Sequence, residues 1–228
     1  MALGWRLELV GAEHLPRGGE GGPMGGWIAV GAPHVTWVEP FVMLVLLPRD
    51  LRLTWFGDGR VLERSRWRRW LLPRLGRVEP IWPGGGPADF ERHVEAVRRA
   101  TDAGDVFALF PERRLAAATP GTTRPFAPGV GYFGLRTDRP MVPIVFGGTH
   151  ELYRGRHIRM AILPPVLARD LAAEASLSGA IHDESDAAHA VAAGLRGLVE
   201  APVAEAHRAT EPAPGTRRRW RWLTHAFR

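Results

Sequence analysis

The chain has 228 residues, of which 45% are hydrophobic and 24% charged, as in a folded domain and unlike a disordered or collagen-like chain. It contains no cysteine, which excludes disulfides, thiolate metal sites and a cysteine nucleophile. The net charge of +6 is compatible with nucleic acid, anionic lipid or an acidic substrate as partner. Residues 60–77 carry seven arginines and one glutamate, and residues 216–228 carry five arginines and no acid. The rest of the chain is therefore mildly acidic.

The hydrophobic segments are too short to span a bilayer. The longest uninterrupted apolar run is Phe41–Leu47, whereas a transmembrane helix needs roughly 20 apolar residues. Residues 1–10 lack the basic region and apolar core of a secretory signal. We therefore expect a cytoplasmic protein without a transmembrane helix.

Hydrophobic patterning predicts alternating strands and helices along most of the chain. Strands are expected at residues 5–10, 27–30, 51–56, 78–82, 106–110, 141–146 and 157–163. Helices are expected at residues 41–47, 61–72 and 87–103, in a short segment ending near 137, and in the alanine-rich segment 186–210. This alternation predicts a single α/β domain with a largely parallel central sheet flanked by helices. We expect that domain over residues 1–210, followed by a linker and a basic Arg/Trp tail over residues 211–228.

His34 is the histidine with the most suggestive surroundings. It follows a predicted buried strand and precedes Glu39 by five residues. Pro40 favours an extended backbone at Glu39, so the carboxylate can turn back towards His34. In such a pair the carboxylate orients the imidazole, which can then accept a proton from a hydroxyl. The same spacing also fits a loop histidine with Glu39 at the helix N-cap.

Phe110-Pro111-Glu112 ends a second predicted buried strand and is followed by Arg113 and Arg114. Ligands of open α/β sheets bind at the carboxyl ends of strands, and adjacent arginines there suit an anionic group such as phosphate. A solvated turn in which Glu112 pairs with its neighbours is the alternative.

Arginine and tryptophan alternate in two segments that suit a lipid headgroup layer. In the predicted helix 61–72 the residues concerned are Arg66, Trp67, Arg69 and Trp70, and in the tail they are Arg217, Trp220 and Trp222. Core tryptophans beneath a solvated arginine face are the structural alternative, and nucleic-acid binding is the functional one. No recognised nucleic-acid motif supports the latter.

Five segments, taken in order, resemble motifs of the glycerolipid (lysophospholipid) acyltransferase family, which includes 1-acylglycerol-3-phosphate acyltransferases. They are residues 10–16, 34–40 and 110–112, the pair Phe126 and Gly129, and residues 140–145. The sequence HVTWVEP at 34–40 is similar to the family's N-H-x-S-x-x-D-P, and the sequence FPE is similar to the start of its F-P-E-G-T-R-S. The resemblance covers residues 7–163.

This resemblance implies an α/β acyltransferase. His34 would deprotonate an acceptor hydroxyl that attacks the thioester of acyl-coenzyme A or an acyl carrier protein, and Glu39 would orient His34. Glu112 would shape the acceptor site, while Gly129 and Pro143 lie in substrate-binding motifs. The implied acceptor is a lysophospholipid or related lipid, with no metal and no cofactor beyond the acyl donor as co-substrate.

The chain also departs from the family pattern. Glu39 stands where the family has Asp, and Pro33 where it has Asn. Both usual phosphate-binding arginines are displaced, so Arg77, Arg113, Arg114 or Arg124 would have to bind a phosphate, and a glycolipid, amino-lipid or other lipid alcohol is an open alternative. In place of the family's N-terminal membrane helices, we expect the two Arg/Trp segments to hold the protein peripherally on the inner face of an anionic membrane.

Two further readings compete with an acyltransferase. A degenerate member of the same fold could bind lipid or acyl groups without turnover. The segments in the places of the family's second and third motifs, residues 76–82 and 110–115, lack the family's usual arginine positions. An Arg-rich nucleic-acid-binding module rests on charge alone and predicts binding that weakens steeply with salt.

Overall fold

The computed structural model describes residues 4–17, 24–58, 76–81, 86–112, 115, 119–177, 181–216 and 219–226. The strands in this part of the chain are β1 (Arg6–Val10), β2 (Ile28–Ala32), β3 (Leu53–Asp58), β4 (Arg77–Ile81), β5 (Val106–Leu109), β6 (Met141–Gly147) and β7 (His157–Ile162). The helices are η1 (Ala12–His14, a 3-10 turn), α1 (Val38–Leu46), α4 (Pro87–Asp102), α5 (Gly129–Thr137), α6 (Ala168–Ser176), α7 (Glu184–Ala209) and α8 (Leu223–Ala226).

The strands form one sheet in the order β1-β7-β6-β2-β5-β3-β4. Every neighbouring pair runs parallel except β6 and β7, which are antiparallel. β2 lies between β5 and β6, and all five of its residues are buried. The carboxyl ends of β2, β5 and β6 therefore lie along the same edge of the sheet.

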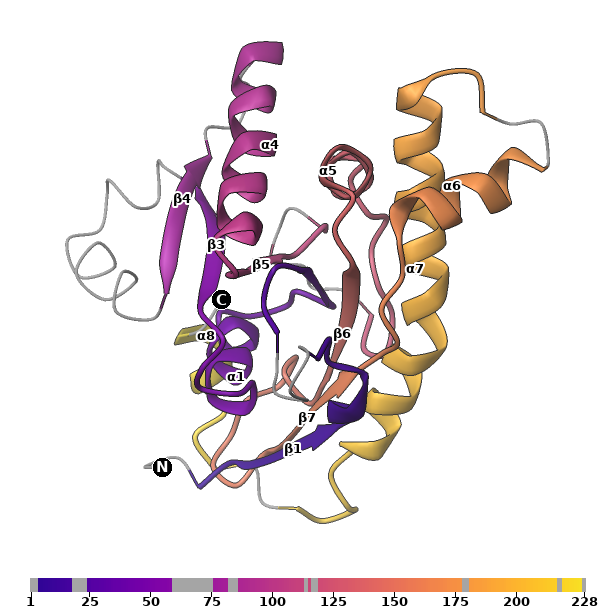
Figure 1. Cartoon of the computed structure of the whole chain (residues 1–228). Helices are drawn as coiled ribbons and strands as arrows, with labels where there is room; N and C mark the ends of the chain where they lie inside the picture. Colours follow the sequence, from indigo (N-terminus) through magenta and orange to yellow (C-terminus); the bar gives the residue numbers. More distant parts are fainter. Residues whose placement is uncertain are drawn as a thin grey trace.

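Helices cover both faces of the sheet (Figure 1). Ile28, Val30 and Ala32 of β2 belong to an apolar cluster that includes buried side chains of α4, α5, α6 and α7. Ala29 belongs to a second cluster, on the opposite face, with buried side chains of α1 and Leu223 of α8. Because successive side chains of a strand point to opposite faces, this near-continuous apolar strand supplies both halves of the core.

The predicted α/β architecture is confirmed, and the predicted strands correspond to β1–β7. α1 spans Val38–Leu46 and so begins before the predicted segment 41–47. Pro40 is accommodated in its first turn because the backbone N–H groups there have no intrahelical partner. α6 was not predicted; it spans nine residues, of which only Ala168 is buried. The helix predicted at residues 61–72 lies outside the described residues.

The described part of the tail packs against the body. Leu223 is buried, and the hydroxyl of Thr224 accepts a hydrogen bond from the Leu152 N–H at 2.8 Å. The Arg154 N–H donates to the Arg219 carbonyl at 2.8 Å. Among the described helices, none combines the length and apolar character needed to cross a bilayer.

Candidate active site

The site lies at the carboxyl ends of two adjacent strands. The loop after β2 carries His34, and the turn after β5 carries Glu112. The backbone N–H of His34 donates to the Glu112 carboxylate at 3.4 Å. Two residues that are 78 positions apart in sequence thus meet where open α/β sheets bind ligands.

His34 and Glu39 form the predicted pair, with 3.2 Å between His34 Nδ1 and Glu39 Oε2. The Glu39 carboxylate is fully buried, and it also accepts hydrogen bonds from the Thr36 backbone N–H at 3.0 Å and from the Thr36 hydroxyl at 3.0 Å. These contacts fix the carboxylate on the first turn of α1. A proton on Nδ1 that is donated to Glu39 leaves the Nε2 lone pair available to accept a proton.

The imidazole of His34 is partly accessible, with 16% of its side chain exposed. One face of the ring stacks on Phe110, with ring centroids 4.1 Å apart and an interplanar angle of 19°. Gly31 makes this stacking possible, because a Cβ atom there would lie 2.4 Å from the Phe110 ring. The ring is therefore held by a carboxylate at one nitrogen and by an aromatic face.

Glu112 is 5% exposed and connects the loop after β2 to the segment before α5. Besides the His34 N–H, its carboxylate accepts the Arg124 backbone N–H at 3.4 Å. Burial raises the pKa of the Glu112 carboxyl, and the two backbone hydrogen bonds oppose this shift. A carboxyl with a raised pKa beside a histidine–carboxylate pair is typical of a functional site.

The other predicted substrate residues have different positions. Gly129 begins α5, five residues after Arg124, whose side chain is exposed while its N–H binds Glu112. Arg77 is the first residue of β4, at the amino edge of the sheet, so it does not lie near His34. Pro143 is buried within β6, opposite Val30 of β2. Arg113 and Arg114 lie outside the described residues.

The predicted membrane residues are also only partly described. Trp220 and Trp222 are exposed on the docked tail, at 45% and 62% of their surfaces. The described residues do not include Arg66, Trp67, Arg69, Trp70 and Arg217.

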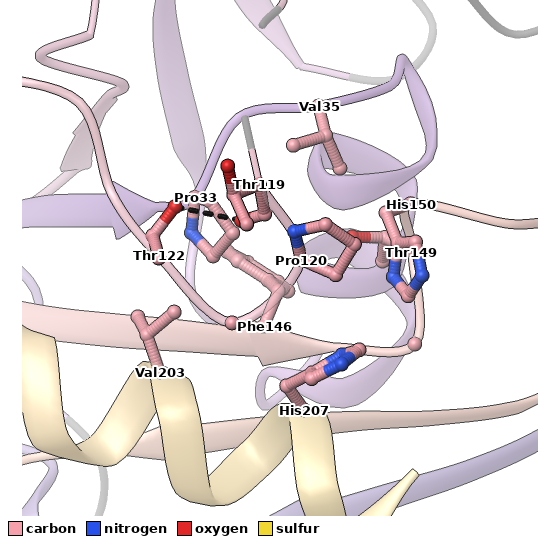
Figure 2. Close-up of a pocket in the computed structure, with 13 residues that line it drawn as sticks. Pro33, Val35, Thr119, Pro120, Thr122, Phe146, Thr149, His150, Val203 and His207 are labelled. Carbon is pink, nitrogen blue, oxygen red and sulfur yellow. Dashed lines mark hydrogen bonds between the residues drawn. The ribbon is translucent and has the colours of Figure 1, made fainter. Parts of the chain in front are cut away.

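A small pocket of about 20 Å³ adjoins the loop that carries His34 (Figure 2). Pro33 and Val35, the neighbours of His34 in sequence, line it together with the end of β6, the turn at residues 119–122, and α7. His150 and His207 face each other across one side, with ring centroids 5.0 Å apart, and His207 Nε2 lies 3.4 Å from Glu211 Oε1. These two histidines were not predictable from the sequence, because the elements that carry them meet only in the folded chain.

No described residues form a cluster of three or more histidine, aspartate or glutamate side chains able to hold a metal ion. The site's described chemistry consists of an oriented imidazole, a buried carboxylate that orients it, and a second carboxyl close by. This set can abstract a proton from a hydroxyl group.

Comparison with known proteins bears on the fold. No protein-family model and no curated protein matches the chain. Among solved structures, it is similar to the 1-acyl-sn-glycerophosphate (LPA) acyltransferase PlsC of Thermotoga maritima, with a TM-score of 0.58 and 17% sequence identity over 89% of this chain and 73% of that chain. This chain has the PlsC fold. The resemblance noted in the sequence is thereby confirmed at the level of fold.

Proposed function

We propose that the protein is an acyltransferase that moves a fatty acyl group from acyl-coenzyme A or an acyl carrier protein to a hydroxyl of a lysophospholipid or related lipid. The observation that carries this proposal is the His34–Glu39 pair, 3.2 Å apart at the carboxyl end of β2, in a chain with the PlsC fold. The resemblance of segments 34–40 and 110–112 to family motifs supports the same activity.

In the proposed reaction, Nε2 of His34 accepts the proton of the acceptor hydroxyl while that oxygen forms a bond to the thioester carbonyl carbon. Glu39 stabilises the imidazolium that results. The tetrahedral intermediate then collapses, the carbon–sulfur bond breaks, and the thiolate leaves and takes up the proton. None of these steps uses a metal or a further cofactor, because a thioester is already activated towards attack.

Glu112 acts in this proposal by positioning. Its carboxylate receives the backbone N–H of His34 and that of Arg124, so it holds the histidine loop against the segment that leads into α5. That segment is where we place the acceptor headgroup. The lipid acceptor is an amphiphile, so we place the enzyme peripherally on the cytoplasmic face of an anionic membrane.

Mass spectrometry of the lipid products tests this activity. Purified protein is incubated with acyl-coenzyme A or acylated carrier protein and with a panel of lysophospholipids, glycolipids, amino-lipids and lipid alcohols. We expect one acceptor class to gain an acyl ester, and His34→Ala to form none. Absence of product with every donor and acceptor, in protein that still binds lipid, would instead support a non-catalytic lipid-binding member of the fold.

A further inference from the structure

α1 lies on the surface of the molecule yet has an apolar outer side. Its only charged residue, Glu39, is fully buried. Phe41, Leu44 and Val45 of α1 and Pro48 just after it follow the i, i+3, i+4, i+7 spacing of one helix face. Val45 is 51% exposed and the other three are half-buried, with Leu44 packing partly on the core. A helix that packs one side on a core normally turns polar side chains to water. We call these four residues the outer stripe of α1.

The docked tail lies on the same face of the sheet. Leu223 of α8 belongs to the apolar cluster that contains Val42 and Met43 of α1, so α8 and α1 both cover this face. Just before α8, Trp220 and Trp222 are both exposed. Trp220 has a φ of 66°, a backbone conformation that a bulky residue rarely adopts. The fold thus keeps two tryptophans in contact with solvent although α8 itself is packed.

Arginines surround these tryptophans. The Arg154 guanidinium lies 5.3 Å from the centre of the Trp220 ring. Arg219 and Arg221 flank Trp220 in sequence and are exposed, and Arg221 pairs with Glu151 at 2.8 Å. Three arginines and one acid give this patch a net positive charge. The other exposed large apolar residues in the described part of the chain are Met24, Leu177 and Leu198, and the last two lie after α6 and on α7, which cover the opposite face of the sheet.

We infer that the outer stripe of α1 and the tail residues Arg219–Trp222 together form one surface that docks on an anionic lipid bilayer. The stripe enters the boundary between headgroups and acyl chains, the tryptophans lie at the interface, and the arginines bind lipid phosphates. The net positive charge of this surface favours an anionic bilayer over a second copy of the chain as the partner, because two positively charged patches would repel each other.

This surface also explains how a lipid could reach the proposed base. α1 begins four residues after His34 and carries Glu39 on its first turn. A bilayer that receives the stripe would therefore lie close to the histidine loop. The inference adds a docking orientation to the proposed function, but its evidence is independent of catalysis.

A single fluorescent label tests insertion directly. Because the chain has no cysteine, Val45→Cys can be labelled at one thiol with an environment-sensitive dye, and Leu177→Cys, at a residue that is 89% exposed, is the matched control. With vesicles of phosphatidylcholine and phosphatidylglycerol, we expect a blue shift and increased emission from the dye at position 45 and no change at position 177. Equal responses at both positions, or none at position 45, would overturn the inference.

Flotation with the same vesicles tests the other half of the surface. We expect Val45→Glu and the double variant Trp220→Ala/Trp222→Ala to bind at least roughly tenfold more weakly, and Arg219→Ala to bind about fivefold more weakly. Leu177→Glu should float like the unmodified protein. Flotation that none of these changes weakens, or a dimer in sedimentation that only Val45→Glu dissociates while vesicles capture nothing, would refute lipid docking.

The outcomes separate this inference from the proposed function. His34→Ala should float normally while forming no ester. Normal flotation without acyl transfer by the unmodified protein would end the enzyme proposal and leave the docking surface standing.

Discussion

The Glu39 carboxylate accepts hydrogen bonds from the backbone N–H and the hydroxyl of Thr36. Its Oε2 lies 3.2 Å from Nδ1 of His34. Glu39→Gln should lower kcat by about 100-fold or more, because a neutral amide stabilises an imidazolium poorly and no longer dictates which ring nitrogen carries the proton. Glu39→Asp should recover part of the loss. Steady-state kinetics check this, and a Gln variant with full kcat would remove Glu39 from the dyad.

Burial of Glu112 predicts a pH dependence of stability. The pKa of Glu112 is raised in the folded protein, so this carboxyl's contribution to stability is fully present below its ordinary pKa and is lost as pH rises through the raised value. Glu112→Gln should therefore gain stability relative to the unmodified protein as the pH rises above the ordinary glutamate pKa of about 4. Urea denaturation at several pH values measures this. The exposed Glu13→Gln is the control, and a parallel change in both variants would contradict the argument.

Close packing between elements sets the position of the His34 ring. A Cβ atom on Gly31 would meet the Phe110 ring at 2.4 Å, so Gly31→Ala should push Phe110 and the stacked His34 out of place. We expect activity to fall by about 100-fold while circular dichroism still shows a folded protein. Gly197→Ala, on the exposed side of α7 with no neighbour within 4 Å, should keep full activity and gain up to about 1 kcal/mol in stability.

Elements with strong local patterns were predictable from the sequence. The apolar strands β2, β5 and β6 and the helices α4 and α7 correspond to predicted segments, because their patterns are set by burial on the sheet. The His34–Glu39 pair was predictable because both residues lie on one short segment. Contacts between distant segments were not: Phe110 on His34, Glu112 on the His34 N–H, and His150 on His207 all depend on topology. Arg77, one of four arginines that could bind a phosphate, lies at the amino end of β4, whereas His34 follows the carboxyl end of β2.

At the scale of the whole molecule, the tail closes part of the core. Leu223 is 5% exposed and Trp222 is 62% exposed, although they are adjacent. Leu223→Ala should reduce the free energy of unfolding by about 2 kcal/mol, whereas Trp222→Ala should change it by less than about 0.5 kcal/mol. The midpoint of urea denaturation, compared at an unchanged m-value, measures the change in the free energy of unfolding for each variant. Equal midpoints for the two variants would show that the tail does not stabilise the body.

The measurement that tests the account most directly is thiol release from acyl-coenzyme A, followed with a thiol-reactive dye, in the presence of the acceptor identified by mass spectrometry. The protein contributes no background because it has no cysteine. We predict acceptor-dependent release that falls by about 100-fold to 10,000-fold in His34→Ala, with the variant still folded. Release that proceeds at the same rate in His34→Ala would contradict the assignment of His34 as the base.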